Sequence, residues 1–162
     1  MQRILLALVL LVLAAPAGLV AAKPLVSDTR IGVHEDTTRF VLDLSEPVAW
    51  RVFTLPDPYR LVIDLPELVW NLPSELPPAK KGLVGALRYG LFSPGVSRGV
   101  LDLTGPAAVT QVQLLPPTDD GKHRLFVDLK PVAEAAFNDP QARLPVQSAE
   151  ALPQAAKAPD VL

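Results

Sequence analysis

The sequence contains no cysteine, one methionine and two histidines among its 162 residues. Without cysteine the chain forms no disulfide, has no thiol nucleophile and cannot be lipidated as a lipoprotein. A catalytic zinc needs about three protein ligands, and neither His34 nor His123 has a second histidine at ligand spacing. No serine stands in a Gly-x-Ser-x-Gly turn, and the adjacent acidic pairs are typical of turns. The sequence therefore predicts no catalytic activity and no cofactor for this chain alone.

The chain also has little excess of charge of either sign. Fifteen Lys and Arg stand against seventeen Asp and Glu, so the formal net charge is −2. Nucleic-acid binding proteins concentrate positive charge against phosphate, and this balance argues against that class. Apolar residues make up 49% of the chain, which is enough to build the core of one domain with tails.

One long apolar run is present, and it lies at the N-terminus. Arg3 is followed by the apolar residues Ile4–Ala22, which end in small side chains. This pattern predicts a signal peptide over residues 1–22, cleaved after Ala22, and export to the periplasm. The alternative is an uncleaved membrane anchor, because the run is just long enough to span a bilayer. In that case the segment is the chain's only contact with a membrane.

One six-residue phrase, Arg-x-apolar-x-Asp-Leu, occurs four times. It begins at Arg39, Arg60, Arg98 and Arg124. RIGVHEDTTRFVLDLSEP, from Arg30, also aligns with RYGLFSPGVSRGVLDLTGP, from Arg88. The sequence thus contains an internal duplication, with repeat one at 26–65 and repeat two at 84–129, joined by a Pro-rich crossover loop at 66–82.

The pattern of each repeat predicts four β-strands. Apolar residues alternate with polar ones between turns rich in Pro, Gly, Asp and Ser. The expected strands are 26–34, 38–44, 47–55, 59–65, 84–92, 97–103, 107–115 and 123–129. We therefore expect an all-β fold, a β-sandwich of two related four-stranded sheets, with each repeat supplying one sheet or a related share. Residues 132–162 are predicted to form a disordered, Ala/Pro-rich, linker-like tail with room for a helical turn at 133–137.

Side chains alternate between the two faces of a strand, which divides the phrase into two sets. In RLVIDL, Leu61, Ile63 and Leu65 share the face expected to form the core, while Arg60 and Asp64 share the other. On the outer face, Arg of one strand can lie opposite Asp of an antiparallel neighbour and fix the register. The alternative interpretation is that these side chains bind a ligand.

The segments PDPYRLVIDLPE and ALRYGLFSPGVSRGVLDLTGP, in their duplicated context, resemble the AMIN domain over residues 24–131. This domain forms the N-terminal part of many periplasmic N-acetylmuramoyl-L-alanine amidases and also occurs in pilus secretins. The resemblance implies a non-catalytic module that binds peptidoglycan and localises its host protein at the division site. The Asp-Pro-Gly-His-Gly-Gly turn that opens the zinc-dependent catalytic domain of such amidases does not occur in this sequence.

The expected ligand is peptidoglycan, whose stem peptides carry carboxylates that suit the planar fork of arginine. Division-site or envelope proteins are further candidate partners. Two alternatives stay open, namely the N-terminal fragment of an amidase without its catalytic domain and a protein-interaction module of a secretin complex. Trp50 is expected in the core, whereas Trp70 is a candidate for stacking on sugar. The candidate binding residues are Arg39, Arg60, Arg98, Arg124, Arg30, Arg88, Tyr59 and Tyr89.

Overall fold

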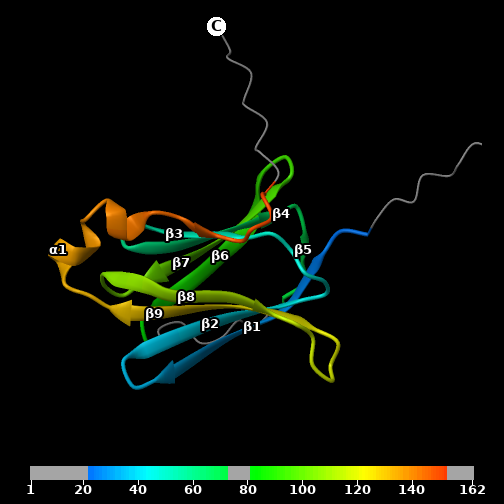
Figure 1. Ribbon diagram of the computed structural model, residues 1–162, viewed down its shortest axis with the longest axis horizontal. Helices are drawn as coiled ribbons and strands as arrows, with labels where there is room; N and C mark the ends of the chain where they lie inside the picture. The colour runs from blue at the N-terminus through cyan, green and yellow to red at the C-terminus, as the bar shows by residue number, and fades with distance from the viewer. Residues whose placement is uncertain (1–21, 73–80, 153–162) are drawn as a thin grey trace, which may run out of the picture.

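Two β-sheets packed face to face make up the computed structural model, which describes residues 22–72 and 81–152 (Figure 1). The predicted signal peptide, apart from Ala22, and the last part of the predicted tail lie outside these ranges. Within them, no helix combines the length and apolar character needed to cross a membrane.

All eight predicted strands are present. The third begins at Arg51 rather than at residue 47, and the other boundaries agree to within two residues. The strands are β1 (Leu25–His34), β2 (Thr37–Leu44), β3 (Arg51–Leu55), β4 (Arg60–Pro66), β6 (Val84–Ser93), β7 (Val96–Leu103), β8 (Ala107–Leu115) and β9 (His123–Pro131). The predicted all-β sandwich is therefore confirmed.

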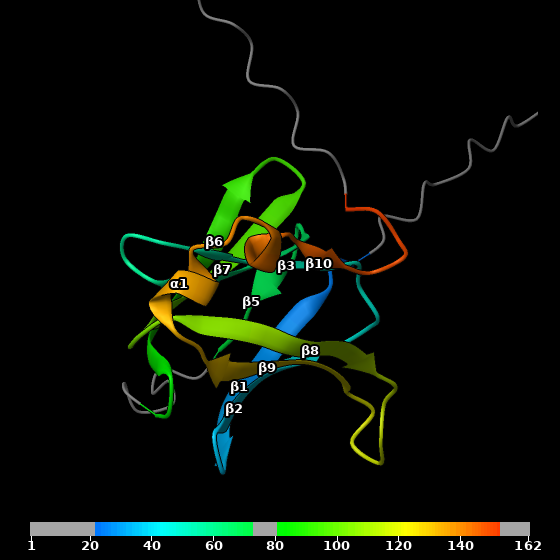
Figure 2. The same ribbon diagram turned by 60° about the vertical axis from the view of Figure 1, so that its left-hand side comes forward.

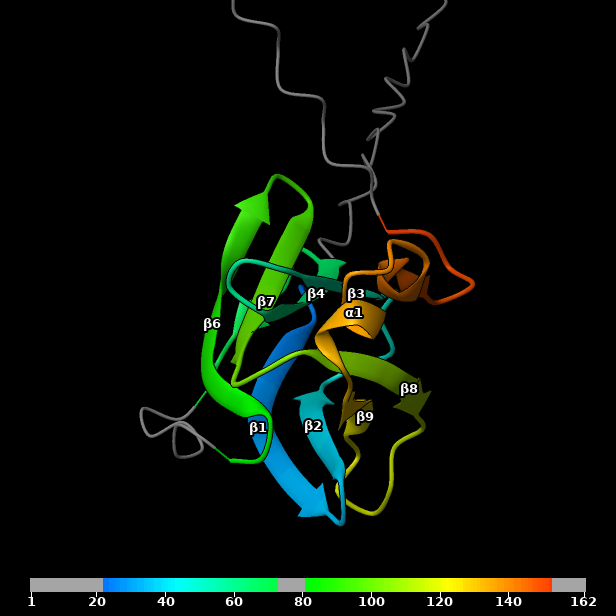
Figure 3. The same ribbon diagram turned by 90° about the vertical axis from the view of Figure 1, so that its left-hand side faces the viewer.

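Each sheet combines strands of both repeats. Sheet A has the order β5-β1-β2-β9-β8, and sheet B has the order β10-β3-β4-β7-β6. Each repeat thus places its first hairpin in one sheet and its second hairpin in the other. Of the two expected arrangements, the structure adopts the one in which each repeat contributes a share to both sheets. The two-residue strands β5 (Val69–Trp70) and β10 (Val146–Gln147) add a fifth strand to each sheet of four long ones. Figure 3 shows the β1–β2 and β6–β7 hairpins projecting from opposite ends of the sandwich.

The core consists of the apolar face that alternation predicted. Leu61, Ile63 and Leu65 of β4 are at most 1% exposed, and their counterparts in the other three phrases join them. Trp50 is also buried in this core, as expected. The counterparts are Phe40, Leu42, Leu44, Leu101, Leu103, Leu125, Val127 and Leu129.

Residues 132–152 differ from the predicted linker-like tail, because they fold back onto the sandwich. This C-terminal strap contains α1 (Glu134–Phe137), η1 (Gln141–Arg143) and β10, and Figure 2 shows it beside β3. Phe137, in the expected helical turn, is 2% exposed and meets the ring of Tyr59 edge-on at 5.0 Å. The backbone N–H and C=O of Trp50 bond to Oγ and N–H of Ser148, each at 3.0 Å. One buried aromatic ring and this pairing hold a segment whose composition alone indicated disorder.

Replacing Phe137 by alanine is expected to release the strap. The loss in global free energy of unfolding should be smaller than the about 3–5 kcal/mol typical of a central phenylalanine. The reason is that the strap can detach while the sandwich stays folded. Hydrogen exchange would show faster amide exchange from Glu134 to Ser148 and unchanged exchange in β4 and β9. Wild-type protection of the strap in this variant would contradict the role given to Phe137.

Candidate functional site: the arginine–aspartate faces

The four repeated phrases lie on four central strands that pair two by two. In sheet A, β2 pairs antiparallel with β9, and in sheet B, β4 pairs antiparallel with β7. In each pair, Arg of one phrase stands opposite Asp of the other. The four facing pairs are Arg39↔Asp128, Arg124↔Asp43, Arg60↔Asp102 and Arg98↔Asp64. The predicted cross-strand register is therefore confirmed for all four copies.

Two of these pairs, one on each sheet, have the same bidentate geometry. Nε and Nη2 of Arg39 donate to the two carboxylate oxygens of Asp128, both at 2.7 Å. The same atoms of Arg98 donate to Asp64 at 2.6 and 3.0 Å. Hydrogen bonding to Asp128 raises the pKa of Arg39 above its usual value. The two pairs occupy matched positions of the duplication, so each outer face presents a planar, fixed guanidinium group.

Aromatic rings lie beneath both guanidinium groups. The carbon of the Arg39 guanidinium is 4.1 Å from the ring centre of Phe126, and that of Arg98 is 3.4 Å from the ring centre of Phe92. A cation over an aromatic face is attracted by the ring and is held in orientation. Each arginine is thus fixed by an aspartate at its edge and by an aromatic ring on one side of its plane.

Two aspartates on these outer faces contact a second arginine, which comes from the strand on their other side. Asp64 also accepts from Nη2 of Arg51 on β3 at 2.6 Å. Asp43 accepts from Nη2 of Arg30 on β1 at 2.5 Å, with Nε of Arg124 at 3.7 Å. The side chain of Asp64 is 0% exposed although it lies on an outer face, because arginine side chains cover it on both sides.

Arg60 and Asp102 stand opposite each other in the register but form no ion pair. Arg60 donates to the backbone carbonyls of Pro58 and Pro56 at 3.1 and 3.4 Å, and no ion pair joins it to Asp102. Asp102 instead accepts from Arg88 of β6 at 2.5 Å. Five of the six candidate arginines thus contact an aspartate of the faces, and their side chains are 21–63% exposed.

The two candidate tyrosines do not join the arginines. The hydroxyl of Tyr59 donates to Glu134 of the strap at 3.2 Å, and its ring contacts Phe137. Tyr89 alternates with Arg88 along β6 and therefore points to the opposite face of sheet B, where it packs on Trp70 with ring centres 4.9 Å apart. Both tyrosines, and Trp70, support neighbouring segments of the fold.

Sequence reasoning missed Arg51 and Phe92 as components of these faces, whereas alternation along the fourth phrase already placed Phe126 on the outer face. Arg51 lies outside the repeated phrase, yet its alternation with the core residues Trp50 and Val52 places it on the outer face. That alternation was the signal available in the sequence. The described residues contain no group of three or more His, Cys, Asp or Glu side chains able to hold a metal ion.

Comparison with known proteins agrees with this architecture. Residues 28–129, more than half of the chain, match the family model of the AMIN domain. A relative, N-acetylmuramoyl-L-alanine amidase AmiC of Neisseria meningitidis serogroup B (strain ATCC BAA-335 / MC58), is 33% identical over 112 residues. The matched segment is 67% of this chain and 27% of the relative, so the chain spans about a quarter of that protein's length. The matched range contains nearly all of both repeats and all four arginine–aspartate phrases, and the chain belongs to the AMIN domain family.

Proposed function

We propose that this chain is a non-catalytic periplasmic module that binds peptidoglycan and localises a cell-wall amidase or a division-associated protein. The observation that carries the proposal is the set of half-exposed arginines fixed by buried aspartates on both outer faces. The amidase relative supports a connection with the cell wall. Export through the predicted signal peptide, with cleavage after Ala22, would bring the module to its ligand.

The chemistry of the arginine–aspartate faces suits the wall polymer. A guanidinium group has five N–H donors, and Arg39 uses two of them on Asp128 while its side chain remains 49% exposed. The remaining donors can bind carboxylates of stem peptides or hydroxyl groups of sugars. Because Asp128 and Phe126 already hold the group in place, little side-chain entropy is lost on binding.

A second candidate function follows from the outermost strand of sheet B. Leu91 and Phe92 of β6 are 62% and 55% exposed, and the described residues provide β6 with no partner on its outer edge. An exposed apolar edge can accept a strand from another protein. This arrangement suits an interaction module of a secretin complex, and crosslinking in intact cells would then give mainly a protein adduct.

The same chain could also serve as the N-terminal fragment of a zinc-dependent amidase, with catalysis located elsewhere.

The first test is sedimentation with purified sacculi. The chain without residues 1–22 is expected to sediment with sacculi at low salt and to be released progressively as salt rises, since screening weakens exposed charge pairs. Recovery of the protein in the supernatant at low salt would contradict the proposal.

Arg39→Gln is expected to weaken sacculus binding by about tenfold, the equivalent of one charge-assisted hydrogen bond. Lys130→Gln is the matched control, because Lys130 lies on β9 of the same sheet and its ion pair with Asp36 is exposed. Urea unfolding of both variants separates lost binding from lost stability. Equal binding by Arg39→Gln and the wild type would remove this face from the proposed site.

A further inference from the structure

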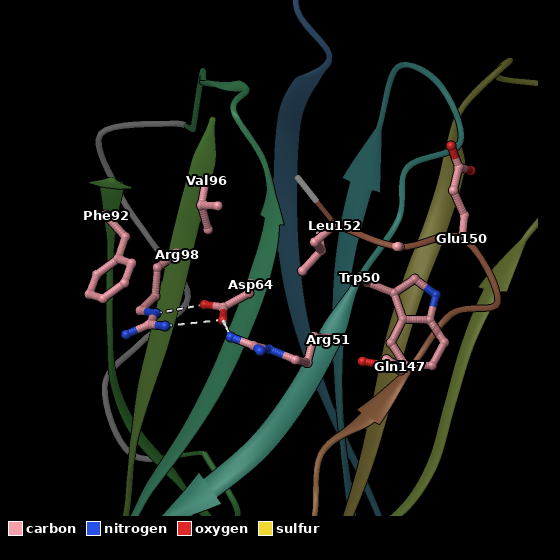
Figure 4. Close-up of a pocket in the computed structure, with 10 residues that line it drawn as sticks. Trp50, Arg51, Asp64, Phe92, Val96, Arg98, Gln147, Glu150 and Leu152 are labelled. Atoms are coloured by element: carbon pink, nitrogen blue, oxygen red, sulfur yellow. Dashed lines mark hydrogen bonds and ion pairs between the residues drawn. The ribbon is translucent and has the colours of Figure 1, made fainter. Parts of the chain in front are cut away.

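A cavity of about 320 Å³ lies between the outer face of sheet B and the C-terminal strap. Figure 4 shows Arg51, Asp64 and Arg98 on the sheet side, with Phe92 beside Arg98 and with Trp50 and Leu152 across the cavity. Its volume is at the lower end of the range of small-molecule sites, about 300–1,000 Å³. Apolar walls around a few fixed polar groups are the usual composition of such a site.

The polar side of the cavity carries an excess of positive charge. Two guanidinium groups share the single carboxylate of Asp64, which leaves one positive charge unbalanced. Nε of Arg51 is buried and has no hydrogen-bond partner among the described residues. Buried N–H groups are rarely left without an acceptor. In Figure 4 the carboxylate of Glu150, which also lines the cavity, points away from both arginines. The cavity therefore lacks one anionic acceptor.

The duplication provides an internal comparison. On sheet A the residue opposite Asp128 on the outer strand β8 is Gln111, where sheet B has Arg51 opposite Asp64. Asp128 consequently contacts one arginine and forms a neutral pair. Within the described residues the strap pairs with β3, and β8 has no equivalent neighbour. The second arginine and the enclosing wall thus occur together on sheet B.

We propose that this cavity binds the terminal carboxylate of a short peptide and that Arg51 is the residue that recognises it. The carboxylate would accept from Arg51 and would balance the extra charge, while the rest of the peptide would lie against the apolar wall. This inference rests on the proposed function in one respect, because the peptidoglycan stem peptide is the source of that carboxylate. It assigns recognition of peptide ends to sheet B. On sheet A the hollow of about 450 Å³ beside Arg39 and Asp128 has a neutral ion pair and, among the described residues, no second arginine.

The test is calorimetric titration of the chain with D-alanyl-D-alanine and with its C-terminal amide. The acid is expected to bind at least tenfold more tightly than the amide, because only the acid supplies a charged acceptor. Arg51→Gln, which installs the residue found at position 111, should abolish this difference. Arg51→Lys keeps the charge without the planar fork and should bind the acid with intermediate affinity. Asp64 keeps its bidentate contact with Arg98 in both variants, and urea unfolding checks that they fold.

Lys130→Gln removes an equal charge from sheet A and should bind the acid as the wild type does. Equal affinity for acid and amide, no binding of either, or wild-type binding by Arg51→Gln would each overturn the inference. Sacculus sedimentation separates it from the proposed function. If the chain sediments with sacculi but does not bind the dipeptide, only the cavity assignment fails. If it binds the dipeptide but not sacculi, only the wall-binding function fails.

Discussion

Replacing Asp64 by alanine is expected to lower the free energy of unfolding by about 3–5 kcal/mol, the cost of removing one partner from a buried ion pair. Asp64 is 0% exposed and accepts three hydrogen bonds from two arginines. Without it, Arg51 and Arg98 would repel each other across the middle of sheet B with no anion between them. Equilibrium unfolding in urea, followed by tryptophan fluorescence, measures the loss.

Asp102 provides the matched control, because it occupies the same position of the repeated phrase on the neighbouring strand. Its side chain is 38% exposed and pairs with Arg88, which is itself 63% exposed. Exposed ion pairs contribute little to stability, so Asp102→Ala should cost less than about 1 kcal/mol. Equal losses in the two variants would show that burial beneath the arginines does not determine the role of Asp64.

These two aspartates show how far the sequence could lead. Period-two alternation predicted the strands, the apolar face and the Arg-to-Asp register, because each depends on local geometry within the phrase. The unequal burial of Asp64 and Asp102 depends on which outer strand lies alongside, and the phrase contains no information about that neighbour. Arg51 of β3 covers Asp64, whereas Ala86 of β6 stands opposite Asp102.

The strap was missed for a different reason. Its Ala- and Pro-rich composition indicates a segment that cannot fold alone, and this holds for residues 132–152 in isolation. What orders them is a surface that the sandwich already provides, including the ring of Tyr59 and the backbone of Trp50. Docking onto a preformed surface is a long-range property that composition does not report.

The arginines need not be assigned either to the fold or to a ligand. Aspartate burial and arginine exposure are properties of the same ion pairs, since the carboxylate of Asp128 is 8% exposed and the side chain of Arg39 is 49% exposed. The carboxylate fixes the strand register, and the guanidinium group it holds keeps free donors on the surface. Loss of the aspartate should therefore reduce stability and binding together, whereas loss of the arginine's outward donors should reduce binding more than stability.

The first phrase of each repeat differs at its second position, and the difference shows how the core is completed. This position is Phe40 in repeat one and Gly99 in repeat two. A Cβ at Gly99 would meet the ring of Trp70 at 3.5 Å, an ordinary contact. Trp70 belongs to β5, which pairs with β1 in sheet A, while its ring reaches Gly99 in sheet B. The indole ring of Trp70 thus lies beside Gly99, the position at which the first phrase of repeat two provides no side chain.

Replacing Phe40 by alanine is therefore expected to cost about 3–5 kcal/mol of unfolding free energy, because the ring is 1% exposed and packs within the core cluster. Gly99→Ala, at the matched position, should change stability by less than about 1 kcal/mol, since the added methyl group fits against Trp70 and strand glycines carry an entropic cost. Urea unfolding of the two variants measures both values. A loss below about 1 kcal/mol for Phe40→Ala would mean that neighbouring side chains refill the site. In that case the two halves of the duplication would be interchangeable at this position, against what their packing indicates.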